Sequence, residues 1–138
     1  IYQKIQVNIE SLGWNTEKDD QATYVIYLPE EEMHEIGILY LNYELLLRKK
    51  KTVYLGRSVP ISNLESLQTQ FEKIIWISQF TVAPKSEQIE TYLEQVKELL
   101  TIGDNEFWAI SYRMKDLNIK VDHKLKTFTS IKETIKTL

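Results

Sequence analysis

One histidine, His34, lies among carboxylates where it could bind a metal. Glu32 precedes it by two residues, Glu35 follows it directly, and Gly37 comes three residues after it. A neutral imidazole is a common transition-metal ligand, and a carboxylate that holds its second ring nitrogen fixes the tautomer and raises the basicity of the ligand. We therefore expect Glu32 to orient His34. For a single histidine, an exposed side chain at a helix start without any function is the simpler alternative.

A few other residues could contact a ligand. Ser78 follows an apolar run, and Ser111 with Tyr112 follows the next one. Each hydroxyl could donate a hydrogen bond to a ligand or satisfy the backbone of its own loop. Gly37 interrupts a helical pattern at a cost of about 1 kcal/mol relative to alanine. This glycine indicates either a bulky group against the helix or close packing of the helix on a sheet.

The segments that position these residues alternate between strand and helix patterns. Apolar, β-branched runs predict strands at 24–28, 53–55, 74–77 and 107–110, with a short fifth strand at 119–121. Helices are predicted at 32–49, at 63–71, from Ser86 to Gly103, and after Ser130, which forms a capping box with Glu133. One apolar face is expected on the helix at 32–49, formed by Ile36, Leu39, Tyr40, Tyr43, Leu46 and Leu47.

This alternation predicts an α/β fold with a doubly wound five-stranded parallel sheet, flavodoxin-like strand order 2-1-3-4-5 and helices on both faces. Ligands bind beyond the carboxyl ends of the strands in such sheets, at the point where the strand order reverses. His34 and Ser78 follow the first and third strands. We therefore expect the site between the ends of these two strands, with Gly56 at the end of the second strand beside them.

Composition and charge narrow the possible functions. The 138 residues carry a net charge of −3, which argues against a nucleic-acid footprint. The absence of cysteine excludes thiolate chemistry and fits a reducing, cytoplasmic location. No apolar run approaches the ~18 residues of a membrane span. Ile1, Ile5, Ile9 and Leu12 recur at helical spacing without a start signal, so residues 1–18 are expected to be the end of an upstream helix plus a linker, and residues 19–138 an α/β domain.

The spacing Glu32-x-His34-x-x-Gly37 after a first strand resembles the D-x-H-x-x-G signature of cobalamin-binding domains. The stretch 53–60 and the run Ser78-Gln79-Phe80 are similar to further segments of that family. The resemblance implies that His34 is the lower axial ligand of cobalt, that Glu32 orients it, and that Ser78 contacts the nucleotide tail. Gly37, Gly56, Ser111 and Tyr112 complete the cofactor site that it implies.

Residues 28–37 resemble more narrowly the C-terminal sensory domains of MerR-family transcription regulators. This resemblance implies a non-enzymatic sensory domain that forms a homo-oligomer and contacts DNA only through an N-terminal domain absent from this chain. Glu32 departs from the family's aspartate, and Ser111-Tyr112 stands where the family has the two glycines that make room for the tail. A fold that has lost its cofactor and serves as a dimerisation or protein-interaction module is therefore the alternative. A third possibility, a subunit of a corrinoid-dependent enzyme, requires a catalytic partner for which the sequence offers no sign.

Overall fold

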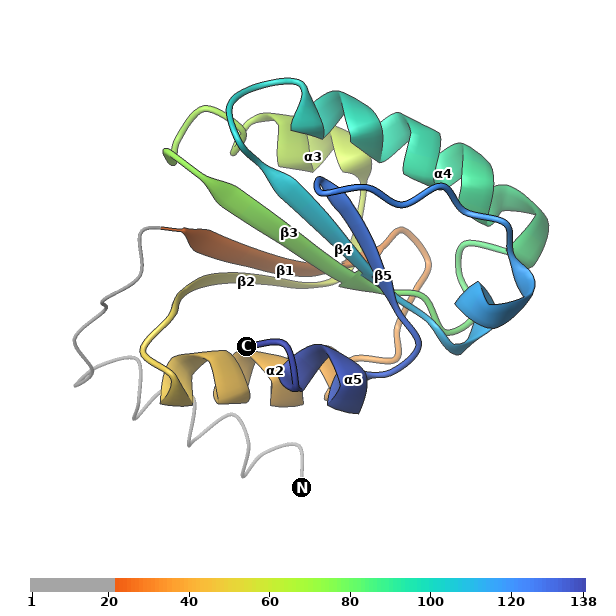
Figure 1. The fold of residues 1–138 in the computed structure, drawn as a ribbon, viewed down its shortest axis with the longest axis horizontal. Coiled ribbons are helices and arrows are strands. Elements are labelled where there is room, and N and C mark those ends of the chain that lie inside the picture. The colour runs from red at the N-terminus through yellow and green to blue at the C-terminus, as the bar shows by residue number, and fades with distance from the viewer. Residues whose placement is uncertain (1–21) are drawn as a thin grey trace.

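A computed structural model describes residues 22–138, so the helix and linker expected within residues 1–21 lie outside the described part. Five strands form one sheet with the order β2-β1-β3-β4-β5, and every pairing is parallel. This order confirms the predicted doubly wound fold (Figure 1). The strands are β1 (Thr23–Pro29), β2 (Lys51–Val59), β3 (Ile74–Gln79), β4 (Glu106–Ile110) and β5 (Leu125–Phe128).

Helices cover both faces of the sheet (Figure 1). One face carries α2 (Ile36–Leu47) and α5 (Ile131–Ile135). The other carries α3 (Ile61–Glu65) and α4 (Ile89–Val96), and α4 is flanked by the short helices η1 (Ser86–Gln88) and η2 (Lys97–Leu100). Because side chains alternate along a strand, Tyr27 and Trp76 pack toward α4, whereas Ile26 and Ile77 pack toward α2. Burial on both faces explains why the central strands read as continuous apolar runs.

The fifth strand was predicted in the wrong place. It spans Leu125–Phe128, and Val121 of the predicted segment 119–121 is exposed. The Asp122 carboxylate accepts hydrogen bonds from the backbone amides of Lys124 and Leu125, which turns the chain into the strand. Leu125 and Phe128 are the buried ends of a strand with an exposed lysine between them, so the segment lacks the apolar run that marks the other strands.

The helix after β1 also differs from the prediction. It begins at Ile36, because residues 32–35 form a loop in which the Glu32 side chain accepts hydrogen bonds from the next two backbone amides. Its sheet-facing side is formed by Ile38, Leu41 and Leu45. Only Leu39 and Leu46 of the predicted face are buried, while three others are exposed: Ile36, Tyr40 and Leu47. The helix is apolar on nearly every side, so the sequence pattern did not define which side meets the sheet.

The two helices predicted to begin at a serine start differently in the structure. Ser130 caps α5 as predicted and accepts a hydrogen bond from the amide of Glu133 at 3.1 Å. Ser86 lies inside η1 and makes no cap; its hydroxyl accepts from Arg113 at 3.2 Å instead. The predicted helix 63–71 is the shorter α3 followed by turns. Among residues 22–138, no helix is long and apolar enough to cross a membrane.

Candidate functional site

Glu32 is a fully buried carboxylate in the loop after β1, three residues beyond the last residue of the strand. Its Oε1 accepts hydrogen bonds from three consecutive backbone amides in the loop after β3, those of Thr81 and Val82 at 2.6 Å and that of Ala83 at 3.1 Å. Its Oε2 accepts from the amides of Met33 at 3.0 Å and His34 at 3.1 Å. One side chain therefore joins the β1–α2 loop to the β3–α4 loop, between the two neighbouring strands whose chains leave toward opposite faces of the sheet.

These donors decide the charge state of Glu32. Burial opposes ionisation, but the imidazole of His34 and the amides of Val82, His34 and Ala83 outweigh it and lower the pKa of Glu32 from 4.5 to about 2. The carboxylate is therefore negatively charged at neutral pH. It is a fixed anion whose hydrogen-bonding capacity is already taken by the protein.

His34 is held by this anion. Its Nδ1 lies 2.8 Å from Oε2 of Glu32, while 60% of its side chain is exposed. Because Glu32 is ionised and can only accept, Nδ1 of the neutral imidazole carries the proton. The lone pair is then on Nε2, on a ring whose orientation is fixed. Such an imidazole can bind a metal that approaches from outside the protein.

The protein does not provide a complete metal site around this histidine. Within residues 22–138, no group of three or more histidine, cysteine, aspartate or glutamate side chains could hold a metal ion. His123 lies in the exposed loop before β5, far along the chain from His34. A metal bound by His34 would take most of its ligands from outside residues 22–138.

Glu35, in the loop after β1, contacts two residues of β2 that lie on either side of Gly56. The Tyr54 hydroxyl donates to Oε2 of Glu35 at 2.5 Å, and Nε of Arg57 lies 3.4 Å from Oε1. Gly56 adopts a φ of +83°, where β2 bulges against Tyr27 of β1. A Cβ at Gly56 would meet its nearest neighbours at 3.7–3.8 Å, an ordinary contact. Backbone conformation, rather than close approach of another group, therefore explains this glycine.

Gly37 faces a different constraint. A Cβ on Gly37 would lie 2.4 Å from Oε1 of Gln79, so the Gln79 carboxamide fills the space beside the glycine. This Oε1 is buried and has no hydrogen-bond donor. Ser78, the preceding residue, is also buried but shares the strand face of Trp76, which packs toward α4. The structure thus separates Ser78 from Gly37 and brings Gln79 to the glycine, a contact that sequence reasoning missed.

Ser111 and Tyr112, after β4, point in different directions. Ser111 is buried; its hydroxyl donates to the carbonyl of Phe80 at 2.6 Å and accepts from the amide of Arg113 at 3.2 Å. It caps the short helix η3 (Tyr112–Asp116). Tyr112 is 71% exposed, and the Lys115 ammonium lies 4.7 Å from its ring centre. Ser111 ties two loops together, and Tyr112 does not fill space at the sheet edge.

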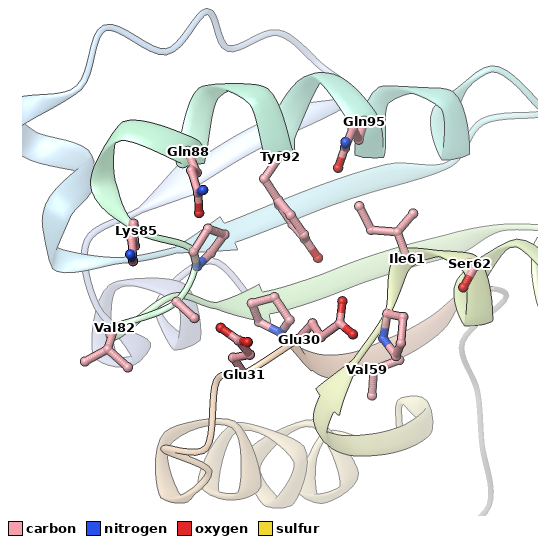
Figure 2. A pocket seen from close by; sticks show the side chains of 14 residues that line it. Glu30, Glu31, Val59, Ile61, Ser62, Val82, Lys85, Gln88, Tyr92 and Gln95 are labelled. Carbon is pink, nitrogen blue, oxygen red and sulfur yellow. The ribbon is translucent and has the colours of Figure 1, made fainter.

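A cavity of about 660 Å³ lies at the same edge of the sheet on the α4 side (Figure 2). Glu30 and Glu31 border it from the β1 end, and Tyr92 points into it from α4. The hydroxyls of Tyr92 and Tyr27 lie 2.6 Å apart, and burial raises the pKa of both phenols above the ordinary value. His34 is not part of its lining. Sequence reasoning missed this cavity because its lining comes from segments that lie far apart in the chain.

Comparison with known proteins supports the fold at the level of structure. No family model matches the chain, and no curated protein matches it. A solved structure of the monomethylamine corrinoid protein of Methanosarcina barkeri is similar with a TM-score of 0.67 and 14% identity, over 96% of this chain and 63% of that one. A novel cobalamin-binding protein from Desulfitobacterium hafniense DCB-2 gives a TM-score of 0.58 and 14% identity, over 99% of this chain and 65% of that one. The chain shares the fold of these two proteins. It spans less than two thirds of the length of either protein.

The fold shared with these two proteins accounts for the backbone but not for every side chain. Glu32 and His34 lie together at the strand edge, as their spacing suggested. The other predicted site residues do not converge on that histidine. Gly56 lies at a bulge of β2, and Ser78 lies on the α4 side of the sheet. Ser111 joins two loops, and Tyr112 is exposed to solvent. Their assignment to a cofactor site stays a prediction.

Proposed function

We propose that this domain is a non-enzymatic, cobalamin-binding sensory domain of a MerR-like transcription regulator, in which His34 would bind the cobalt. The observation that carries this proposal is the Glu32–His34 pair. A buried anion accepts five backbone amides and the imidazole, and so fixes a solvent-exposed ring with Nε2 available. This is how proteins commonly prepare a histidine as a metal ligand.

The ligand set favours a cobalt complex over a free ion. His34 belongs to no group of three or more metal-binding side chains among residues 22–138, so the site suits a metal that already carries ligands. Cobalamin, when bound, would supply a cobalt ion that already carries most of its ligands, and His34 would hold that cobalt through Nε2. The likeness of the fold to two corrinoid- or cobalamin-binding structures supports this choice of complex.

The space beside α2 fits a cofactor less well. Gly37 provides room against the sheet, but the end of the Gln79 side chain occupies that room. A bound tail at this position requires the carboxamide to rotate away. Since a glutamine end is flexible and its Oε1 has no hydrogen bond to lose, this rearrangement is inexpensive. We therefore regard the residues as compatible with the cofactor, with Gln79 as the group that must move.

The regulatory part of the proposal rests on the resemblance of residues 28–37 to MerR-family sensory domains. A net charge of −3 suits a domain that leaves DNA contact to another part of its protein. Cofactor binding at His34 would change the association of copies of the chain if the cofactor favours one oligomeric state. A ligand shifts such an equilibrium only by the difference between its affinities for the two states.

A second function is favoured by one observation, the Gln79 carboxamide beside Gly37. If the glycine exists to accommodate Gln79, the domain has replaced the cofactor with its own side chain. The fold would then serve as a dimerisation or protein-interaction module. Ser111, whose hydroxyl is bound within the protein, fits this alternative as well.

Spectroscopic titration separates the two functions. Hydroxocobalamin and adenosylcobalamin are added to the 138-residue chain, and the visible spectrum is followed for replacement of the lower axial ligand by histidine. We expect a saturable change at micromolar cofactor for the wild type and its loss in His34→Ala. His123→Ala is the matched control, because this second histidine lies in an exposed loop outside the site.

The outcome that would sink the cofactor proposal is a wild-type spectrum without a saturable change. A change that persists in His34→Ala would show cofactor binding without the proposed ligand. A change lost equally in His34→Ala and His123→Ala would point to general loss of structure, which circular dichroism of both variants tests.

A further inference from the structure

The cavity of about 660 Å³ on the α4 side of the sheet edge has no part in the Glu32–His34 contact (Figure 2). Its volume is that of a site for a small organic molecule. The ends of β1 and β2, the start of α3, the loop after β3 and the inner side of α4 all contribute to it. It therefore lies beyond the carboxyl ends of the strands, where ligands of such sheets bind.

The cavity has an apolar wall with little freedom to move. Pro29 at the end of β1, Pro60 before α3 and Pro84 in the loop after β3 each contribute a ring, and Ile61 lies beside them. A proline ring loses no rotamer freedom when a ligand covers it. This wall offers a preformed surface to a ring or another bulky apolar group.

Two consecutive carboxylates, Glu30 and Glu31, border the cavity on the side of β1 (Figure 2). Glu31 adopts a φ of +71°, and its backbone amide donates to the Ser58 hydroxyl at 3.0 Å, which fixes this turn against the end of β2. Lys85 lies on the rim, but no ion pair within residues 22–138 joins it to either carboxylate. Both carboxylates are therefore available to a ligand, and the lining carries an excess of negative charge.

Two phenols meet between the sheet and α4. The hydroxyls of Tyr27 and Tyr92 lie 2.6 Å apart, Tyr27 is fully buried, and Tyr92 points into the cavity. Ser78 lies in register with Tyr27 on the neighbouring strand, and its buried hydroxyl has no hydrogen-bond partner within the described residues. When Tyr92 donates to Tyr27, the Tyr27 hydrogen can turn toward Ser78. The Tyr92 oxygen then keeps a lone pair for a donor in the cavity.

We propose that this cavity binds a small primary amine with an apolar, ring-containing body. An ammonium group has three hydrogens to donate, and the cavity offers three acceptors for them: the carboxylates of Glu30 and Glu31 and the hydroxyl oxygen of Tyr92. The body of the amine packs on the wall formed by the prolines. This inference does not depend on cobalamin binding, because His34 is outside the lining.

Three probes that share an indole ring test the preference for an ammonium group. Tryptamine carries the ammonium, tryptophol has a hydroxyl in its place, and indole-3-acetate carries a carboxylate. Each is titrated into the 138-residue chain at neutral pH and followed by calorimetry and by amide chemical shifts. We expect saturable binding of tryptamine, at least tenfold weaker binding of tryptophol, and shifts centred on the loop at Glu30 and on α4 around Tyr92.

Three outcomes of these titrations overturn the inference. Absence of saturable tryptamine binding would show that the cavity holds no amine of this kind. Equal affinities for tryptamine and tryptophol would show that the ammonium is not recognised. Tighter binding of indole-3-acetate would assign the cavity to an anion held by Lys85.

Substitutions at the cavity identify the groups that hold the amine. Glu30→Gln keeps the length of an exposed side chain and should weaken tryptamine binding about fivefold. Tyr92→Phe removes only a hydroxyl and should weaken it by a similar factor, about fivefold. Glu94→Gln is the matched control, since it removes a carboxylate from the same helix as Tyr92 outside the lining and should change nothing.

Circular dichroism of each variant checks that the fold is intact. Glu30→Gln serves the test even if Tyr92→Phe unfolds, because the Glu30 side chain is exposed and makes no hydrogen bond within residues 22–138. Equal weakening in Glu30→Gln and Glu94→Gln would show general attraction between charges, and it would count against a site in this cavity.

Discussion

Two parts of the same sheet edge, one between β1 and β3 and one after β4, differ in whether a polar side-chain atom remains available to a ligand. Between β1 and β3, Glu32 uses its whole hydrogen-bonding capacity to hold two loops and one imidazole, and His34 keeps a nitrogen directed outward. After β4, the Ser111 hydroxyl bonds only to the protein itself, and Tyr112 extends into solvent. The first part orients a histidine that could bind a metal, whereas the second only joins two loops of the protein.

The topology explains this difference. β1 and β3 are neighbours, but their following helices lie on opposite faces, so the two loops separate and expose backbone amides to each other. A single carboxylate there can collect donors from both loops. The chain after β4 returns to the adjacent strand β5, and its polar groups find partners in the loop after β3. We therefore expect a binding site where the loops after two neighbouring strands lead to helices on opposite faces of the sheet.

We expect the largest loss of unfolding free energy for Glu32→Gln. The amide keeps the shape of the side chain, but it loses the charge and turns donors toward backbone amides that are themselves donors. We expect a loss of about 2–3 kcal/mol of unfolding free energy at pH 7, allowing for solvent that reaches the loops. Urea denaturation measures it, and Glu87→Gln, an exposed glutamate in η1, is the control.

Lowering the pH from 4.5 to about 2 should remove the difference in unfolding free energy between the wild type and Glu32→Gln. The folded-state pKa of Glu32, about 2, lies below its ordinary value of 4.5, so the folded state is stabilised above pH 4.5 and loses this contribution as the pH falls from there toward 2. The wild type should therefore approach the stability of Glu32→Gln near pH 2. A difference that is the same at pH 7 and pH 2.5 would show that charge is not what holds these loops.

An intermediate effect is expected for Ser111→Ala. It removes the buried hydroxyl that donates to the Phe80 carbonyl at 2.6 Å and caps η3, which should cost about 1 kcal/mol. Tyr112→Ala, at the exposed neighbour, should change the unfolding free energy by less than about 0.5 kcal/mol. Thermal or urea denaturation checks both. A larger loss for Tyr112→Ala would reverse the roles assigned to this pair.

The smallest effect on stability is expected for Gln79→Ala, which should stay within about 1 kcal/mol because the buried Oε1 has no hydrogen bond to lose. Its effect on binding is more informative. If the proposed function holds, we expect tighter binding of cobalamin and unchanged binding of cobinamide, which lacks the nucleotide tail, because only the tail would compete with the carboxamide beside Gly37. An equal change for both ligands would remove Gln79 from the tail space.

The sequence determined much of the fold and half of the candidate site. Continuous apolar runs identified the first four strands, and their alternation with helices predicted the strand order, because strands buried on both faces have few other arrangements. The spacing of two residues between Glu32 and His34 was enough to suggest their contact, since side chains so close in one tight loop lie within reach of each other.

Only the tertiary structure decided the rest. The partners of Glu32 in the loop after β3, the meeting of Gln79 with Gly37 and the separation of Ser78 from both depend on contacts between distant segments and on which face of a strand each side chain occupies. The buried side of α2 was equally undetermined, because a helix that is apolar all round can pack by any side until the sheet and α5 select one.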